Sequence, residues 1–348
     1  MLKEILTKLI ALITAIFIVS VTVLLGKELL SSKLYVMASS QNQWTGVAVS
    51  RSGRIFVNYP TWSDSVPIKV AEIKQFCAKP YPDINTNNKL FKAVQSVFID
   101  KKDRLWILDT CNPQFKGVLD GGPKLYQYNL KKNKLVKVYT FPANTYHNNS
   151  YFNDIRIDEN RNYAYITDSG SGAIIVLNLT TQKARRLLEN SQSVKSETDH
   201  LICNGIRWEN NVDSDGIALT PNRKYLYYIA LTSHSLYRIR TAALRNENLS
   251  AEKLEKMVEY VAKIPATDGM IFDDLGNLYL GGLEDNSINM LTKNKKLKKF
   301  VRSNPLIRWA DSFALDSAGN LLFTTSQIYL PEEKRIKYQL ICVYLTYK

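Results

Sequence analysis

The segment DGMIFDDLGNLYL, residues 268–280, contains two short apolar runs that flank the polar turn DDLG. Turns rich in Asp, Asn and Gly between two such runs are typical of β-hairpins. Five further segments follow the same plan, and they begin at Thr45, Gln95, Asn153, Asp215 and Asp311. Successive starts lie 43 to 62 residues apart, a spacing that indicates a repeat architecture. The chain therefore contains six copies of one hairpin unit.

Further apolar segments follow the hairpin in most copies, for example KLYQYNL and LVKVYTF within residues 124–141. Four strands per unit and six units predict an all-β fold, a six-bladed β-propeller with four-stranded blades. We expect residues 32–348 to form this domain, with the last strand, 339–346, pairing with the N-terminal unit to close the ring. One short helical insertion is predicted at 249–264, where Ser250 provides an N-cap and apolar residues follow helical spacing.

The first 31 residues are predicted to be a signal peptide or a signal-anchor. Lys3 and Lys8 precede an uncharged apolar run from Leu9 to Gly26, which is the charge arrangement of a signal peptide. The run is also just long enough to span a membrane, and no clear cleavage site follows it directly. Both alternatives predict a protein that is secreted, periplasmic or membrane-anchored on the extracytoplasmic side. A buried core helix fits this terminal position and charge pattern less well.

The formal net charge is +14, from basic residues scattered along the chain. The densest basic run is KNKKLKKF, residues 293–300. A solvated hairpin explains this run better than a nucleic-acid site, because no nucleic-acid-binding motif accompanies it. The general basicity also fits attraction to an anionic membrane surface. We expect a small-molecule partner, no nucleic acid, and membrane contact only through the N-terminal segment if that segment is uncleaved.

The four cysteines, Cys77, Cys111, Cys203 and Cys342, fit an exported protein. An even count allows two disulfides, with three connectivities. We expect Cys77 to pair with Cys111, because this pairing closes the shorter loop. The alternative is a set of unpaired, buried thiols. No pair has the CxxC spacing, so the sequence does not indicate a zinc site.

The first residues of the six copies are predicted to converge, because the innermost strands of a propeller surround its central channel. All six are polar: Thr45, Gln95, Asn153, Asp215, Asp268 and Asp311. We predict that four of them form a ligand-binding site: Asn153, Asp215, Asp268 and Asp311. Asp268 and Asp215 are the candidate catalytic residues. Neighbouring carboxylates raise one another's pKa unless a proton, a lysine, a cationic ligand or a metal ion compensates. The alternative is that these side chains only bond to the backbone and join adjacent blades.

Several long motifs resemble the major royal jelly protein/yellow family, and most closely its bacterial members, which are described as related to dopachrome tautomerase. They include NDIRID (153–158), DGIALTPNRKYLYYIALTSHSLYRIRTAAL (215–244) and RWADSFALDSAGNLLFTTSQI (308–328). The resemblance covers about residues 44–330. It implies a six-bladed propeller and an extracellular-type location. It does not imply one activity, because the family includes dopachrome-converting enzymes, nutrient proteins and salivary proteins that hold biogenic amines in the channel.

A more distant likeness is to the propeller lactonases of the gluconolactonase/regucalcin group. In that group a Glu, two Asn and an Asp hold a divalent metal over the channel. The matching positions here are Thr45, Asn153, Asp215 and Asp268. Thr45 lacks the charge of the Glu, so the likeness implies at most three metal ligands, Asn153, Asp215 and Asp268, for a cation such as Ca²⁺ or Zn²⁺.

These observations leave four hypotheses of function. The first is an exported protein that binds a small aromatic or cationic molecule in the channel. The second is a tautomerase of the dopachrome type, in which carboxyl groups move a proton. The third is a metal-dependent lactonase or esterase. The fourth is a non-catalytic surface scaffold. Whether the protein is an enzyme stays open at this point, and the first hypothesis is preferred.

Overall fold

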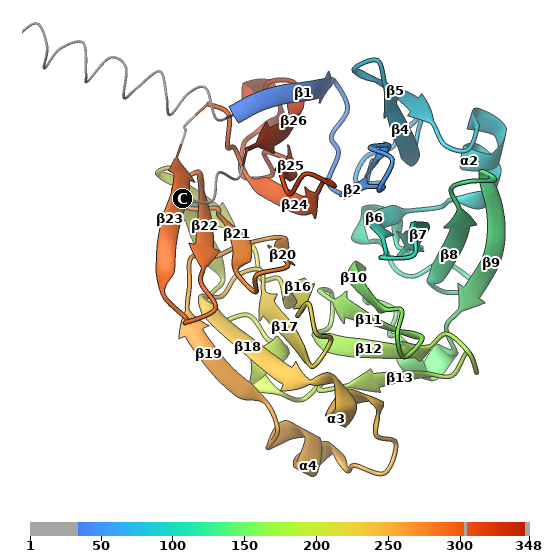
Figure 1. Cartoon of the computed structure of the whole chain (residues 1–348), viewed down its shortest axis with the longest axis vertical. Helices are drawn as coiled ribbons and strands as arrows, with labels where there is room; N and C mark the ends of the chain where they lie inside the picture. The colour runs from blue at the N-terminus through green and yellow to red at the C-terminus, as the bar shows by residue number, and fades with distance from the viewer. Residues whose placement is uncertain (1–33, 303–304, 345–348) are drawn as a thin grey trace, which may run out of the picture.

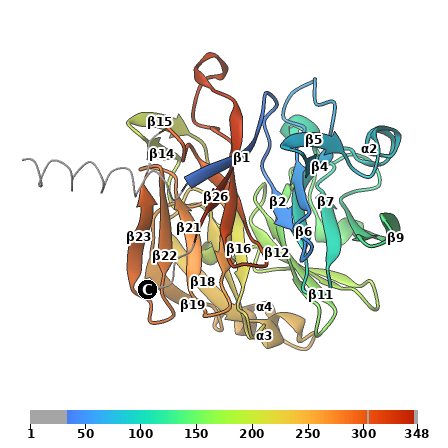
Figure 2. The same cartoon turned by 45° about the horizontal axis from the view of Figure 1, so that its top comes forward.

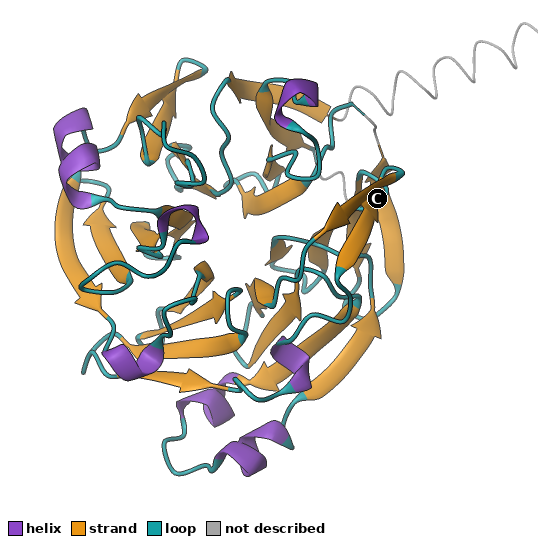
Figure 3. Cartoon of the chain, turned by 180° about the vertical axis from the view of Figure 1, so that it is seen from behind, coloured by secondary structure: helices purple, strands orange, loops and turns teal. Residues whose placement is uncertain are grey.

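The computed structural model describes residues 34–302 and 305–344. Within these ranges, six four-stranded antiparallel sheets are arranged radially around one axis (Figure 1). Figure 3 shows the same arrangement from behind, with strands as the dominant element. The predicted all-β, six-bladed propeller with four-stranded blades is therefore confirmed.

Each blade runs from an innermost strand at the axis to an outermost strand at the rim. The first three blades are β2 (Val47–Val49), β3 (Ile55–Asn58), β4 (Val70–Lys74) and β5 (Cys77–Pro80); β6 (Val94–Ile99), β7 (Arg104–Asp109), β8 (Lys124–Asn129) and β9 (Lys134–Thr140); and β10 (Phe152–Asp158), β11 (Tyr163–Asp168), β12 (Ala173–Asn178) and β13 (Ala184–Leu187). The last three are β16 (Ser214–Leu219), β17 (Tyr225–Ala230), β18 (Ser235–Arg240) and β19 (Glu259–Lys263); β20 (Met270–Phe272), β21 (Leu278–Gly282), β22 (Ser287–Leu291) and β23 (Leu297–Arg302); and β24 (Ala310–Leu315), β25 (Leu321–Thr325), β26 (Tyr338–Val343) and β1 (Leu34–Ser40).

The core lies between the blades, and strand β7 shows why its sequence is apolar without interruption. Side chains alternate between the two faces of a strand. Leu105 and Ile107 pack with residues of blade one, whereas Trp106 and Leu108 pack with residues of blade three. All four side chains are fully buried. A strand covered on both faces needs apolar residues at every position, which explains the long apolar motifs.

The ring is closed by strands from both ends of the described chain. Strand β1 pairs antiparallel with β26, with Leu34 opposite Val343 and Ser40 opposite Tyr338. The last strand therefore does not pair with the N-terminal unit, as predicted, but with a strand that precedes this unit in the chain. The outermost strand of blade six thus comes from the start of the chain, so the ring cannot open without breaking this β1–β26 pairing.

The predicted helix at 249–264 is correct at its start and wrong in its length. Ser250 caps α4 (Ala251–Glu255), and its Oγ accepts the backbone N–H of Lys253. The helix ends at Glu255, and residues 259–263 form β19, the outermost strand of blade four. The β-branched and aromatic residues of EYVAK favour a strand, and the free edge of β18 supplies its backbone partners.

Short elements lie between or beside the blades. They are α2 (Ile84–Leu90), α3 (Thr241–Arg245), the hairpin β14 (His200–Cys203) and β15 (Ile206–Glu209), and the 3-10 helices η1 (Pro113–Phe115), η2 (Ala143–Thr145), η3 (Gln192–Val194) and η4 (Glu332–Lys334). Figure 2 shows that β14–β15 and α3–α4 lie at opposite ends of the molecule. The β14–β15 hairpin has no counterpart in the other copies, and repeat spacing could not predict it.

The predicted disulfide between Cys77 and Cys111 is not formed, because all four cysteines are free thiols. Cys77 is exposed and opens β5, at the outer edge of blade one, whereas Cys111 is buried just after β7 of blade two. The short sequence separation therefore does not bring the two thiols together. The alternative, unpaired thiols, holds for Cys111, Cys203 and Cys342, which are buried.

The predicted signal segment, residues 1–31, lies outside the described residues. Among the residues that the structure does describe, no helix combines the length and apolarity needed to cross a membrane. The expectation of a signal peptide or signal-anchor therefore stays a prediction from the sequence.

Candidate ligand site at the channel mouth

The structure places all six predicted ring residues within two residues of the start of an innermost strand. Five of them line one cavity of about 1050 Å³ at one end of the channel, here called the mouth cavity: Gln95, Asn153, Asp215, Asp268 and Asp311. Thr45 does not line it. The Thr45 Oγ1 instead accepts a hydrogen bond from Asn58 Nδ2 at 2.9 Å and donates to the carbonyl oxygen of Gln95 at 3.4 Å, so this position joins blade one to blade two.

Bulges position most of these side chains. The pairing register shifts between Phe152 and Ile155 in β10, between Ser214 and Ile217 in β16, and between Val94 and Ser96 in β6. A bulge bends the strand and changes the direction of a side chain. Asn153, Asp215 and Gln95 lie within these bulges and reach the cavity from them; β24 has an equivalent shift around Asp311.

The DG motif requires glycine after the aspartate for a steric reason. A Cβ on Gly216 would lie 2.2 Å from the carbonyl oxygen of Asp268, and a Cβ on Gly269 would lie 2.4 Å from that of Asp311. Only glycine allows the neighbouring innermost strands to approach this closely. The motif therefore combines one residue that lines the cavity with one that lets the next blade pack against it.

A chain of hydrogen bonds runs along one wall of the mouth cavity. Trp62 Nε1 donates to the Tyr151 hydroxyl at 2.7 Å, and this hydroxyl donates to Gln95 Oε1 at 2.8 Å. Gln95 Nε2 then donates to Asn153 Oδ1 at 3.3 Å, and Asn153 Nδ2 donates to Asp215 Oδ2 at 2.7 Å. The direction of every donor is fixed by the amide and indole groups, so the chain ends by presenting an N–H to the Asp215 carboxyl group.

The other carboxyl groups have fewer partners. Trp309 Nε1 donates to Asp268 Oδ2 at 2.7 Å, and Asp268 is also a hydrogen-bond partner of Asp215. Asp311 is buried, yet its Oδ2 has no hydrogen-bond partner among the residues that the structure describes. An unpaired buried carboxyl oxygen is costly, which marks Asp311 as a position where a ligand could supply the missing donor.

The pKa values of these three carboxyl groups are raised. Burial is the largest cause for Asp215 and Asp268, followed in both cases by repulsion from Asp311. Burial also raises the pKa of Asp311 to about 7, while the nearby hydroxyls of Ser326 and Ser312 offset part of the rise. Every charged group that shifts the pKa of these carboxyls is another aspartate. No described cation is among the groups that shift these three pKa values. Arg335 also lines the mouth cavity, and its Nε donates to the carbonyl oxygen of Leu330 at 2.8 Å.

Aromatic side chains surround the entrance of the mouth cavity. Phe115 stacks on Tyr151 with ring centroids 4.5 Å apart, and it is 61% exposed. Trp62 also stacks on Phe115, with ring centroids 6.2 Å apart. Trp208, from β15, packs edge-on against Trp309 at 4.9 Å. Sequence reasoning missed these residues because they come from connections that do not repeat.

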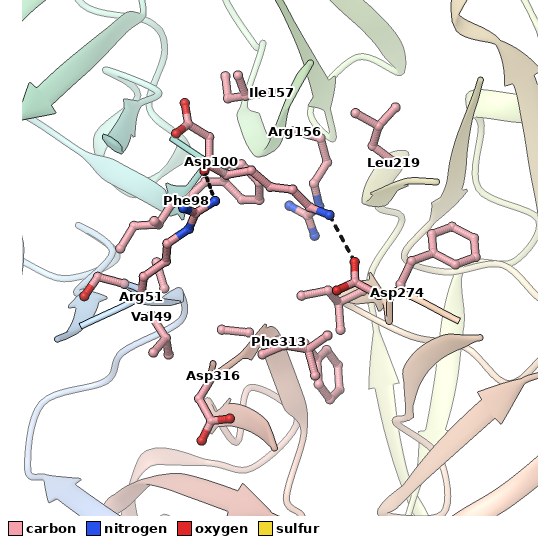
Figure 4. A pocket seen from close by; sticks show the side chains of 18 of the residues that line it. Val49, Arg51, Phe98, Asp100, Arg156, Ile157, Leu219, Asp274, Phe313 and Asp316 are labelled. Carbon is pink, nitrogen blue, oxygen red and sulfur yellow. Dashed lines mark hydrogen bonds and ion pairs between the residues drawn. The ribbon is translucent and has the colours of Figure 1, made fainter. Parts of the chain in front are cut away.

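An arginine on β10 connects blade three to blade five. Arg156 Nη1 donates to Asp154 Oδ1 at 2.9 Å, and Arg156 Nη2 donates to the carbonyl oxygen of Met270 at 2.7 Å. Because Arg156 belongs to blade three and Met270 to blade five, this side chain joins two blades that are not adjacent in the ring. It lines a second cavity of about 400 Å³ at the other end, with Phe98 and Phe313 (Figure 4). The sequence contained a sign of this role, because Arg156 is a basic residue within the strand motif NDIRID.

Three comparisons relate this chain to known proteins. The family model described as major royal jelly protein matches residues 92–328. Major royal jelly protein 6 of Apis mellifera is 26% identical over 260 residues, which cover 66% of this chain and 58% of that protein. Protein yellow of Drosophila pseudoobscura pseudoobscura is 27% identical over 220 residues, or 56% of this chain and 39% of that protein. The chain spans about half the length of the curated relatives it matches.

Solved structures share the fold at low identity. A gluconolactonase from Xanthomonas campestris aligns with a TM-score of 0.56 at 12% identity, over 89% of both chains. Virginiamycin B lyase from Staphylococcus aureus aligns with a TM-score of 0.53 at 14% identity, over 90% of this chain and 99% of that one. At these identities the likeness extends to the propeller fold alone.

Proposed function

Since this chain belongs to the major royal jelly protein family, whose members share no single activity, we propose a function from the mouth cavity itself: it binds a small cationic aromatic molecule. The observation that carries this proposal is the cluster of Asp215, Asp268 and Asp311. These carboxyl groups are buried together, and the charged groups that shift their pKa values are all other aspartates. An ammonium group supplies the missing charge and the missing hydrogen-bond donors.

The proposed ligand is an arylalkylamine. Its ammonium group lies among the three carboxyl groups and donates to the unpartnered Oδ2 of Asp311. Its ring lies against the aromatic entrance formed by Phe115 and Trp208, where stacking contributes without further charge. The carboxyl groups lose protons when the cation enters, because a nearby positive charge lowers a carboxyl pKa.

A dopachrome-type tautomerase activity would use the same residues. Such a reaction removes a proton from one atom of the substrate and returns one to another atom, so it needs a base and an acid in one cavity. Asp215 and Asp268 are hydrogen-bond partners with raised pKa values, so one carboxylate and one carboxylic acid can coexist there. This pair supports the tautomerase proposal as a second step after binding.

The metal-dependent lactonase hypothesis has weaker support. Asn153, Asp215 and Asp268 line one cavity and offer oxygen ligands for Ca²⁺ or Zn²⁺. Blade one contributes none, because Thr45 is turned to Asn58 and away from the cavity. Among the described residues, no group of three or more His, Cys, Asp and Glu side chains has the arrangement of a metal site. Three oxygen ligands, one of them neutral, are fewer than the six to eight that Ca²⁺ usually takes in proteins.

Titration calorimetry of the full chain tests these proposals together. We expect tyramine and tryptamine to bind, and the Asp268→Asn variant to bind them at least tenfold more weakly, because one ion pair is lost. The control variant is Glu332→Gln, an exposed rim residue of the same cavity, which should bind like the parent. Binding of Ca²⁺ or Zn²⁺ that Asp268→Asn abolishes, without amine binding, would instead support the lactonase. Equal amine binding by parent and Asp268→Asn would contradict the proposed site.

A further inference from the structure

The end of the propeller opposite the mouth cavity is strongly basic. This surface, here called the turn face, is formed by the turns that link β2 to β3, β4 to β5, and the equivalent strands of the other blades. Exposed lysines or arginines lie in or beside such turns in blades one to five. Six of the lysines are Lys74, Lys101, Lys131, Lys132, Lys295 and Lys296. Of these, Lys74 ends β4 and pairs with Glu72 at 3.2 Å. The basic run 293–300 is the β22–β23 turn of this face with the start of β23.

Acidic residues on the turn face do not balance this charge. Within the short hairpin turns of this face, all of which the structure describes, Asp274 is the only exposed carboxylate, and it pairs with Lys101 at 3.0 Å. The longer connection from β18 to β19 exposes Glu247, Glu252 and Glu255, together with Lys253 and Lys256. The loops on the mouth side differ: the segment between β25 and β26 alone exposes Glu332 and Glu333 together with Lys334 and Lys337. The excess positive charge of the molecule is therefore concentrated on the turn face, at the end opposite the mouth cavity.

Two turns of this face present large apolar side chains to solvent. Phe76 is 72% exposed at the tip of the β4–β5 hairpin, and Leu275 is 61% exposed in the β20–β21 turn. Gln75 and Phe76 form a two-residue loop in which both φ angles are positive, 48° and 65°. Such loops favour Asn-Gly. A phenylalanine there adds backbone strain and little burial, so its exposure points to a role outside the fold.

The chain enters the propeller from the same face. Leu34 lies opposite Val343, and Val343 lies opposite Leu321 at the end of blade six remote from Asp311. Beside this entry point the exposed rings of Tyr35 and Tyr344 pack edge-on at 5.0 Å. Between the predicted apolar segment and Leu34 there are residues 27–33, which span at most about 25 Å when extended. A membrane holding that segment would thus lie near the turn face.

We propose that the turn face docks on an anionic phospholipid membrane, with the mouth cavity directed away from it. The lysines of the turns face the headgroups, where each contributes about a fivefold gain in binding. Phe76 and Leu275 enter the interface, and the tyrosine pair lies at headgroup level, where such rings are favoured. The exposed side chains of Phe76 and Leu275 favour a membrane over a nucleic acid, because the phosphates of a nucleic acid offer apolar groups no partner.

The test is hydrogen exchange of the full chain in nanodiscs of phosphatidylcholine, with and without phosphatidylglycerol. We expect the turns at 74–77, 131–134 and 293–297 to exchange more slowly only when phosphatidylglycerol is present. The triple variant Lys293→Ser, Lys295→Ser, Lys296→Ser should lower the ratio of docked to undocked molecules about a hundredfold. Phe76→Asn, which suits the positive φ, should weaken docking without destabilising the fold.

The matched control is the triple variant Lys92→Ser, Lys334→Ser, Lys337→Ser, which removes the same charge from exposed positions on the mouth side. It should dock like the parent. Equal exchange of the turns in both kinds of nanodisc would overturn the proposal. So would a loss of docking in the control variant as large as in the turn-face variant. So would protection of the same turns by duplex DNA at ionic strengths where phosphatidylglycerol gives none.

Discussion

Asp311 shows how position in the fold, and not residue type, sets the chemistry of a carboxyl group. The sequence predicts its place in the ring, because it begins a repeat. It does not predict a pKa near 7, which depends on burial and on the distances to other aspartates. The same limit applies to Arg156 and Phe115, which reach the channel from a strand interior and from a non-repeating connection. Aligning the six copies identifies features that the copies share at equivalent positions, and neither Arg156 nor Phe115 is such a shared residue.

The raised pKa of Asp311 predicts a pH-dependent stability. Because the folded pKa is above the unfolded value, this group stabilises the fold fully below about pH 4, and that stabilisation is lost as pH rises through about 7. Asp311→Asn should therefore raise the free energy of unfolding by a few kcal/mol more at about pH 8 than at about pH 5. Urea denaturation at both pH values measures the difference.

The control for this prediction is Asp120→Asn, an exposed position, whose effect on the free energy of unfolding should be small at both pH values. If Asp311→Asn changes stability equally at both, the carboxyl group is not the buried acid described above.

At the scale of elements, regular repeats were predictable and departures from them were not. The hairpin motif correctly located all six innermost strands. The segment 249–264 was misread because its apolar spacing fits a helix, while the open edge of β18 decides in favour of β19. The β14–β15 hairpin, which brings Trp208 to the mouth cavity, occurs once. Tertiary contacts determine the structure of both segments, and local sequence patterns do not contain those contacts.

The DG motif gives a prediction at this scale. Gly269→Ala should lower the free energy of unfolding by about 2–3 kcal/mol, because the new Cβ would lie 2.4 Å from the Asp311 carbonyl oxygen and push two innermost strands apart. Chemical denaturation measures this loss. In Gly319→Asn the new Cβ would meet nothing within 4 Å, so this variant should cost less than about 1 kcal/mol. Equal losses in both variants would mean that close strand approach is not why the motif needs glycine.

The whole molecule has two different ends. Six copies of one unit, closed by β1 and β26, place a cluster of acids and aromatic rings at one end of the channel and a basic surface with apolar tips at the other. The sequence predicted the ring of blades and the convergence of polar residues. The sequence did not predict that the basic side chains gather at the end of the propeller opposite the mouth cavity. That outcome depends on how the turns of all six blades are brought together in the closed ring.

The central claim is that the mouth cavity recognises positive charge next to an aromatic ring. The most direct measurement compares, by calorimetry on the full chain, tyramine with 4-ethylphenol, which has the same phenol ring and ethyl chain but no amine. We predict that tyramine binds at least tenfold more tightly, because only its ammonium group compensates Asp215, Asp268 and Asp311. Equal affinities, or tighter binding of 4-ethylphenol, would contradict the claim.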